Sequence, residues 1–302
     1  KSESFIVLDI GTYSVKALYV ETKGEQVNTS YSDKRHASGD ISSDGSFNIS
    51  GITNTCRSAL ADLPRSSKKT VLGIGGGFVY GKTLTQTYIR EQPHKEIEES
   101  ELANIIQKVQ QRNFEQIRRD FKRETGRSEL EVHIIAGSVQ DIKIDGYQVV
   151  SPIGFKGKEV TCSLFNSYIP KIYLGIFNDL ISALNLELAG IISQPYAVFS
   201  KQFKQNTAEQ DFILIDIGGS ATEVSVVRKG KLDDIRSISV GGSSFTRSIS
   251  ENLKIGFWEA ENIKLKFSGG HVSAAVAKKI ESILAQDVEL FLHGLEIVLS
   301  DL

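Results

Sequence analysis

FIVLDIGTYSVKALYVE (residues 5–21) and FILIDIGGSATEVSVVRKGK (residues 212–231) decide the fold of this 302-residue chain. Each segment opens with an apolar run typical of a buried strand, turns at an Asp-x-Gly sequence, and continues into a strand of alternating apolar and polar residues. We therefore predict two β-hairpins with the same tip. Because the copies start about two hundred residues apart, they indicate two related halves rather than a short-period solenoid.

The charge composition restricts the class of partner. The chain contains 35 Lys and Arg residues against 37 Asp and Glu residues, so it has no broad positive field to attract nucleic acid or an anionic membrane. We therefore expect no nucleic-acid partner. With 40% hydrophobic residues, the chain can fill the cores of roughly two domains.

Cysteine and histidine usage argues against a metal or disulfide scaffold. Cys56 and Cys162 lie far apart without CxxC spacing, and the five histidines are scattered without metal-ligand spacing. This pattern favours a reducing cytoplasm. No run of eighteen apolar residues and no signal-peptide layout is present, so we expect a chain that neither spans a membrane nor is secreted.

Hydrophobic periodicity places the remaining elements. Residues 96–122 carry the apolar stripe of an amphipathic helix, and residues 132–154 alternate in strand fashion around the turn Asp145-Gly146. We also predict polar hairpin and loop material over 22–50, helices over 52–63 and 173–188, strands over 71–78 and 189–200, two short helices broken near Gly256, and a final helix from residue 274 to the chain end.

One segment matches the P-loop pattern G-x-x-x-x-G-K-[ST], from Gly76 to Thr83; we refer to it as the Walker-like segment. A working P-loop needs a helix directly after the Lys-Thr pair, because helical N–H groups hold the phosphates. Here LTQTYIRE follows, with the alternation and β-branched residues of a strand. We therefore interpret the match as fortuitous.

The two Asp-x-Gly tips are better candidates for phosphate binding. Glycine permits a tight turn and leaves backbone N–H groups open to an anion, while the hydroxyls of Thr12, Ser14 and Thr222 can add donors. Asp9 and Asp216 can hold Mg²⁺ through water, since this hard ion keeps much of its hydration. Two such tips facing each other would hold one triphosphate from both sides.

These motifs carry a family resemblance. DIGTYSVK and DIGGSATE resemble the two phosphate motifs of the actin, Hsp70 and sugar-kinase superfamily. Within it the chain most resembles FtsA, the bacterial cell-division actin homologue, through GIGGGFVYG, SVGGSSFTRSI, EAENIK and the Pro-Ile-Gly-Phe-x-Gly element at 152–157. PilM, of pilus assembly, is similar as a near relative. The resemblance extends over nearly the whole chain.

The resemblance implies an α/β, actin-like (ribonuclease H-like) fold of duplicated domains with an inserted α+β subdomain of the FtsA IC type. The subdomain boundaries that it implies are 1–80 with 169–200 for IA, 81–168 for the IC-like insertion, 201–242 for the first part of IIA, and 243–302 for a IIB-like helical subdomain.

The resemblance also assigns roles to residues. It implies ATP with Mg as cofactor, metal contacts from Asp9 and Asp216 through water, and Gln194 as a catalytic residue that orients the hydrolytic water. Lys278 and Lys279 are candidates for pairing with an acidic partner tail. The implied cofactor-binding residues are Asp9, Gly11, Thr12, Tyr13, Ser14, Lys16, Asp216, Gly218, Gly219, Ser220, Thr222, Gly241, Gly242, Glu261 and Lys264.

As function, the resemblance implies a cytoskeletal scaffold of bacterial cell division. Such a protein binds ATP, polymerises with itself into actin-like filaments, and tethers FtsZ by its C-terminal tail. It is cytoplasmic and peripheral at the inner face of the membrane at the division site, and contacts other division proteins through the IC-like subdomain. In FtsA the membrane contact is a C-terminal helix, which has no counterpart in this sequence; we expect nucleotide and membrane binding to belong to the longer parent protein more securely than to this chain.

Departures from the family pattern leave alternatives open. The second motif usually reads D-[IL]-G-G-G-T-T-D, whereas this chain has Ser220, Ala221 and Glu223 at the varied places, so we expect at most a weak ATPase with ATP as a structural cofactor. A PilM-like pilus assembly protein, a phosphotransferase or polyphosphatase of the same superfamily, and a nucleotide-free interaction module remain alternative readings.

Overall fold

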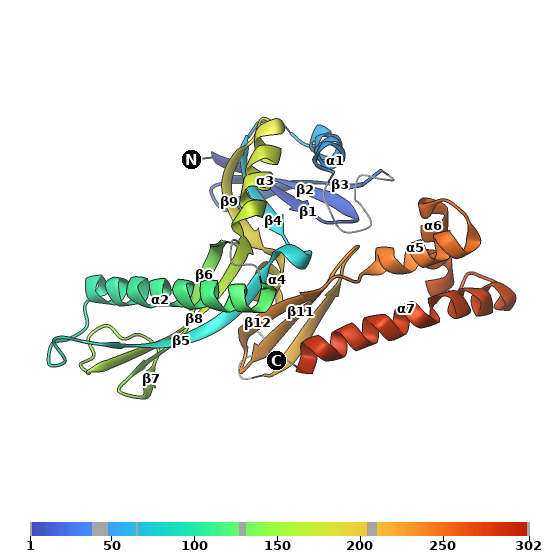
Figure 1. Ribbon diagram of the computed structural model, residues 1–302. Coiled ribbons are helices and arrows are strands. Elements are labelled where there is room, and N and C mark those ends of the chain that lie inside the picture. The colour runs from blue at the N-terminus through green and yellow to red at the C-terminus, as the bar shows by residue number, and fades with distance from the viewer. Residues whose placement is uncertain (1, 38–47, 65, 127–130, 204–209, 301–302) are drawn as a thin grey trace.

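The computed structural model describes residues 2–37, 48–64, 66–126, 131–203 and 210–300. Part of the loop material expected over 22–50 and the last two residues of the expected final helix lie outside these ranges. Figure 1 shows an upper unit built around the N-terminal strands, an arm that carries the long helix α2, and a helical arm that ends with α7.

The upper unit is a five-stranded sheet in the order β3-β2-β1-β4-β9. The first three strands form an antiparallel meander, and β4 and β9 add in parallel. Leu8, Val15 and Leu72 have no exposed surface and pack in one core with residues of α1 and α3. The bounds are β1 (Ser2–Ile10), β2 (Ser14–Lys23), β3 (Gln26–Arg35), α1 (Ile49–Ala61), β4 (Lys69–Ile74), α3 (Lys171–Ala183) and β9 (Glu187–Ser193).

The second sheet has seven strands in the order β10-β11-β12-β5-β8-β6-β7. It unites the second hairpin with the strands of the inserted segment, through a short antiparallel contact in which Asp234 and Ile235 face Lys82 and Gly81. The bounds are β5 (Tyr80–Ile89), β6 (Val132–Ile144), β7 (Tyr147–Val149), β8 (Glu159–Pro170), β10 (Phe212–Ile217), β11 (Thr222–Arg228) and β12 (Lys231–Ile238).

Helix α2 (Glu99–Thr125) lies across the β5, β6 and β8 part of this sheet (Figure 1). It buries Ile105, Val109, Ile117 and Phe121 of the predicted apolar stripe, and also the polar Asn113 between them. The helix ends at Gly126, whose φ of 65° is the left-handed conformation that favours glycine after a helix. The prediction of an amphipathic helix here is confirmed.

Three helices form the arm after β12. They are α5 (Gly242–Leu253), α6 (Phe257–Ser268) and α7 (Ala274–Ser300), and the break between the first two falls at 254–256, as expected. Their small core contains Ile249, Ala260, Ile280 and Leu284. None of the helices in the described ranges is both long and apolar enough to cross a bilayer.

Two expectations are wrong at the border of the upper unit. The predicted helix 173–188 is too long. Helix α3 ends at Ala183, because Asn185 takes a φ of 56°, and residues 187–188 already belong to β9. The predicted strand 189–200 ends at Ser193, where α4 (Gln194–Val198) and the helical turn η2 (Phe199–Phe203) begin. Ser193 caps α4 by accepting the Tyr196 N–H, and Pro195 fits its first turn, so helix-start signals override the apolar strand pattern.

Candidate functional site

Both Asp-x-Gly segments are hairpins, as predicted, and their tips touch. Strands β1 and β2, and likewise β10 and β11, pair antiparallel on either side of the turns. The Ser220 N–H donates to the Thr12 hydroxyl at 2.9 Å, which joins the two tips directly. A Cβ added to Gly219 would lie 2.7 Å from Thr12 Oγ1 and 3.1 Å from the Tyr13 nitrogen, so only glycine allows this approach.

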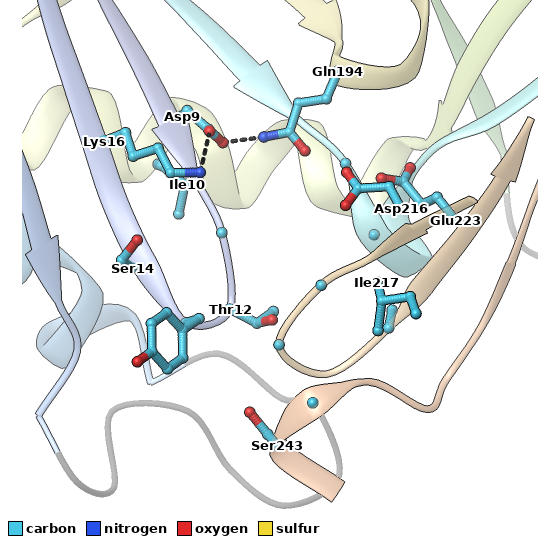
Figure 2. A pocket seen from close by; sticks show the side chains of 18 of the residues that line it. Asp9, Ile10, Thr12, Ser14, Lys16, Gln194, Asp216, Ile217, Glu223 and Ser243 are labelled. Atoms are coloured by element: carbon cyan, nitrogen blue, oxygen red, sulfur yellow. Dashed lines mark hydrogen bonds and ion pairs between the residues drawn. The ribbon is translucent and has the colours of Figure 1, made fainter. Parts of the chain in front are cut away.

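A cleft of about 680 Å³ lies between the hairpins (Figure 2). The Tyr13 ring meets Trp258 of α6 edge-on, with ring centroids 5.8 Å apart, so a second contact joins the two sides. The predicted residues that line the cleft are Asp9, Gly11, Thr12, Tyr13, Ser14, Lys16, Gln194, Asp216, Gly218, Gly219, Gly242, Glu261 and Lys264.

The two hairpins differ in the residue that faces their aspartate across the strands. In the first hairpin Asp9 faces Lys16, whose Nζ lies 3.5 Å from Asp9 Oδ2. In the second hairpin Asp216 faces Glu223. The equivalent positions therefore carry a cation in one half and a carboxyl group in the other. As a result, Asp9, Asp216 and Glu223 are among the carboxyl groups that line this cleft, and Lys16 forms an ion pair with Asp9 (Figure 2).

Gln194 lines the cleft beside Asp9. Its Nε2 donates a hydrogen bond to Asp9 Oδ1 (Figure 2). Its Oε1 fills the space where a side chain at position 75 would begin, so Gly75 is required for this arrangement. Burial raises the pKa of Asp9, and the nearby Asp216 adds to that effect, while Lys16 opposes it. The role of Gln194 in orienting water stays a prediction.

Glu223 is the most perturbed acid of the site. It is only 5% exposed, and burial, opposed by a hydrogen bond from the Gly76 backbone and reinforced by Asp216 and Asp9, raises its pKa to about 8. Its Oε1 has no hydrogen-bond partner among the described residues. A buried, strongly perturbed carboxyl group in a cleft is typical of a functional site.

The Gly241-Gly242 loop at the start of α5 is hydrogen-bonded to the second hairpin. The Gly242 N–H donates to the Gly218 carbonyl at 2.9 Å, and the Ser243 N–H donates to the Gly219 carbonyl at 2.7 Å. A Cβ at Gly241 would meet both carbonyl oxygens at 2.6 Å, so glycine is required there. Gly241 therefore holds the hairpin and does not line the cleft.

The buried Glu261 and the partly buried Lys264 form an ion pair beside that loop. The Lys264 ammonium group donates to the Gly242 carbonyl at 2.8 Å, to Thr246 Oγ1 at 2.7 Å and to Glu261 Oε2 at 2.8 Å. These contacts use all three of its N–H donors. In this structure the pair thus fixes the loop, and its predicted contact with ribose and base stays a prediction.

Four other predicted residues lie elsewhere. The hydroxyl of the fully buried Thr222 donates to the Val240 carbonyl at 2.8 Å, and neither Thr222 nor Ser220 lines the cleft. Thr222 therefore secures the hairpin instead of offering a donor to a ligand. Lys278 and Lys279 lie exposed on α7, outside the cleft.

The Walker-like segment does not form a P-loop. Its Lys-Thr pair lies within strand β5, and the Thr83 hydroxyl donates to the Leu232 carbonyl at 2.8 Å. The prediction of a strand after the glycines is confirmed. Sequence reasoning nevertheless missed that Gly75 and Gly76 line the cleft, and it also missed Asp33, Glu223 and Ser243. The unusual acid in the second motif was the available signal for Glu223.

The cleft residues fit a Mg²⁺ ion that is bound together with phosphates. No three His, Cys, Asp or Glu side chains in the described part of the chain come close enough to hold an ion by themselves. Mg²⁺ in nucleotide sites is commonly held by one or two carboxylates, waters and phosphate oxygens. Asp9 and Asp216, with the orphaned Glu223 oxygen beside them, match that donor set.

Comparison with known proteins bears on this geometry. The family model described as "Cell division protein FtsA" matches residues 213–289. The cell division protein FtsA of Bacillus subtilis (strain 168) is 22% identical over 291 residues, which cover 92% of this chain and 61% of that protein. FtsA of Streptococcus pneumoniae serotype 2 is 21% identical and covers 94% of this chain and 60% of its own length.

Among solved structures, a PilM-PilN type IV pilus biogenesis complex aligns with a TM-score of 0.64 at 14% identity, covering 98% of this chain and 78% of that chain. Such a likeness shows the fold alone. This chain spans about three fifths of the length of the curated relatives that it matches.

The duplicated hairpins, the sheet order of the upper unit and the shared cleft define a protein with the actin-like fold. Within that class, the chain is similar to the cell division protein FtsA over about nine tenths of its length.

The raised pKa of Glu223 predicts a specific pH dependence of stability. Its ordinary value is 4.5 and its folded value is about 8, so between these pH values the native state binds a proton that the unfolded state has lost. The free energy of unfolding therefore falls as the pH rises through this window, and the whole penalty is present above pH 8. We expect Glu223→Gln to be more stable than the natural chain at pH 9, by about 2 to 5 kcal/mol, and equally stable at pH 4.5 or below.

Urea unfolding at several pH values measures this difference. The matched control is Glu281→Gln on the exposed surface of α7, which should follow the profile of the natural chain. A Glu223→Gln difference that does not change with pH would contradict the assignment.

Proposed function

We propose that this chain binds ATP with Mg²⁺ between its two hairpins and acts as an FtsA-like scaffold of bacterial cell division. The observation that carries the proposal is the direct meeting of two Asp-x-Gly tips over one cleft, with Asp9 and Asp216 on opposite sides. Backbone N–H groups of two tight turns and two carboxylates are the groups that a magnesium triphosphate needs.

The roles of the individual residues follow from their positions. The hairpin backbones would hold the phosphates, and Lys16 adds a positive charge from the first hairpin. Asp9 and Asp216 would hold Mg²⁺, whose chemistry is to neutralise phosphate charge. Gln194, fixed by its bond to Asp9, would order water beside the ion.

Several features favour a structural use of ATP over rapid turnover. The carboxyl groups of Asp9, Asp216 and Glu223 repel a further anion, and among the described residues only Lys16 lies close enough to Asp9 for an ion pair. In phosphoryl transfer, catalysis depends mostly on positive groups placed around the transferred phosphoryl group. We therefore propose at most a weak ATPase.

Partner binding extends the proposal beyond the cleft. By similarity to FtsA, the partners are the C-terminal tail of FtsZ, further copies of the chain in a filament, and other division proteins at the arm that carries α2. The place of action is the cytoplasmic face of the membrane at the division site. The PilM-PilN likeness favours a pilus peptide as the alternative partner, but only at the level of the fold.

Nucleotide binding tests the cleft. We expect isothermal titration calorimetry to show Mg-dependent ATP binding by the natural chain, and Gly219→Ala to weaken it about tenfold or more, because the added Cβ forces Thr12 and Tyr13 away. Two controls should stay within about twofold of the natural affinity. Gly77→Ala adds a Cβ that meets no atom within 4 Å, and Lys82→Met alters the Walker-like segment. Lost binding in Lys82→Met with normal binding in Gly219→Ala would contradict the site.

Peptide binding tests the scaffold role. We expect fluorescence anisotropy to show binding of an FtsZ C-terminal tail peptide, and charge reversal of Lys278 and Lys279 to weaken it at least fivefold at low salt, since exposed pairs depend on ionic strength. Lys254→Glu, at the end of α5, is the matched charge-reversal control on the same arm. Preferential binding of a pilus peptide would favour the PilM-like alternative.

A further inference from the structure

A buried histidine that does not line the cleft contacts the backbone of the first hairpin. His36 follows β3 and is 5% exposed. Its ring Nε2 lies 2.9 Å from the Gly11 carbonyl oxygen, and its backbone N–H donates to the Tyr13 carbonyl at 3.3 Å. Because a carbonyl oxygen only accepts, the Nε2 atom carries the proton and donates it.

This hydrogen bond sets the direction of one peptide group. The Gly11–Thr12 peptide is planar and trans, so its C=O and N–H point in opposite directions. Since the Gly11 carbonyl points at His36, the Thr12 N–H points the other way. Gly11 and Thr12 line the cleft and His36 does not, so the N–H that points away from His36 can face the space between the hairpins.

We propose that His36 is a positioning residue for phosphate binding, which orients the Gly11–Thr12 peptide so that the Thr12 N–H can donate to a phosphate oxygen. The inference rests on the proposed function, because it assigns a phosphate to the cleft. His36 does not line the cleft and acts only through the hairpin backbone.

Helix α1 fixes the ring itself. His36 Nδ1 lies 3.2 Å from the hydroxyl of the buried Thr55, and that hydroxyl also lies 3.2 Å from the Gly51 carbonyl. A hydroxyl can donate to a neutral Nδ1, or accept from a protonated Nδ1 while it donates to Gly51. Both ring states are satisfied at Nδ1, and the bond from Nε2 to Gly11 persists in both.

Two substitutions separate the two ring nitrogens. The amide nitrogen of glutamine is as many bonds from the backbone as Nε2, whereas that of asparagine matches Nδ1. His36→Gln therefore keeps the donor to Gly11, and His36→Asn keeps only the contact with Thr55. We expect calorimetry to show ATP·Mg affinity within about threefold of the natural chain for His36→Gln and weaker by about tenfold or more for His36→Asn.

A second readout needs no nucleotide. Amide hydrogen exchange of a peptide spanning residues 9–16 should be faster in His36→Asn and near the natural rate in His36→Gln, and thermal unfolding of both variants reports any general loss of stability. Equal exchange and equal affinity in the two variants would overturn the positioning role and leave a merely structural one. If the natural chain binds no ATP but the exchange difference appears, the proposed nucleotide site fails while His36 still orients the hairpin.

Discussion

The contact between the two hairpin tips is the constraint on which the rest of the site depends. Because Gly219 has no side chain, the second tip can approach Thr12 and Tyr13 closely. The Ser220 N–H then donates a hydrogen bond to the Thr12 hydroxyl. Each hairpin belongs to a different sheet, so this small contact joins two separately built halves. Through it, Asp9 of the first hairpin comes to line one cleft with Asp216 and Glu223 of the second (Figure 2).

The same contact creates an electrostatic cost. Two aspartates and a glutamate share a partly dry space, and burial is the main reason that the pKa values of Asp9 and Glu223 are raised. The hydrogen bonds from Gln194 to Asp9 and from the Gly76 backbone to Glu223 offset part of it. A cation that enters with phosphates would offset more of this electrostatic cost. Ligand binding would therefore stabilise the folded chain.

The hairpins could be predicted from sequence because their signals are local: an apolar run, an Asp-x-Gly turn and an alternating strand. The Walker-like segment was dismissed correctly for the same reason, since the strand pattern after Thr83 is local too. Residues whose role depends on how the halves meet could not be found this way. Gly75 and Gly76 enter the cleft, the Thr222 hydroxyl turns away from it, and Glu223 contacts the Gly76 backbone across the cleft only after both sheets have formed.

A crystal structure of the chain with Mg²⁺ and a non-hydrolysable ATP analogue tests the central claim most directly. The account predicts the phosphates between the backbones of Thr12 and Gly219, with the ion on the side of Asp9 and Asp216. Phosphates bound instead beside Lys82, or hairpin tips that lie apart with no nucleotide between them, would contradict it.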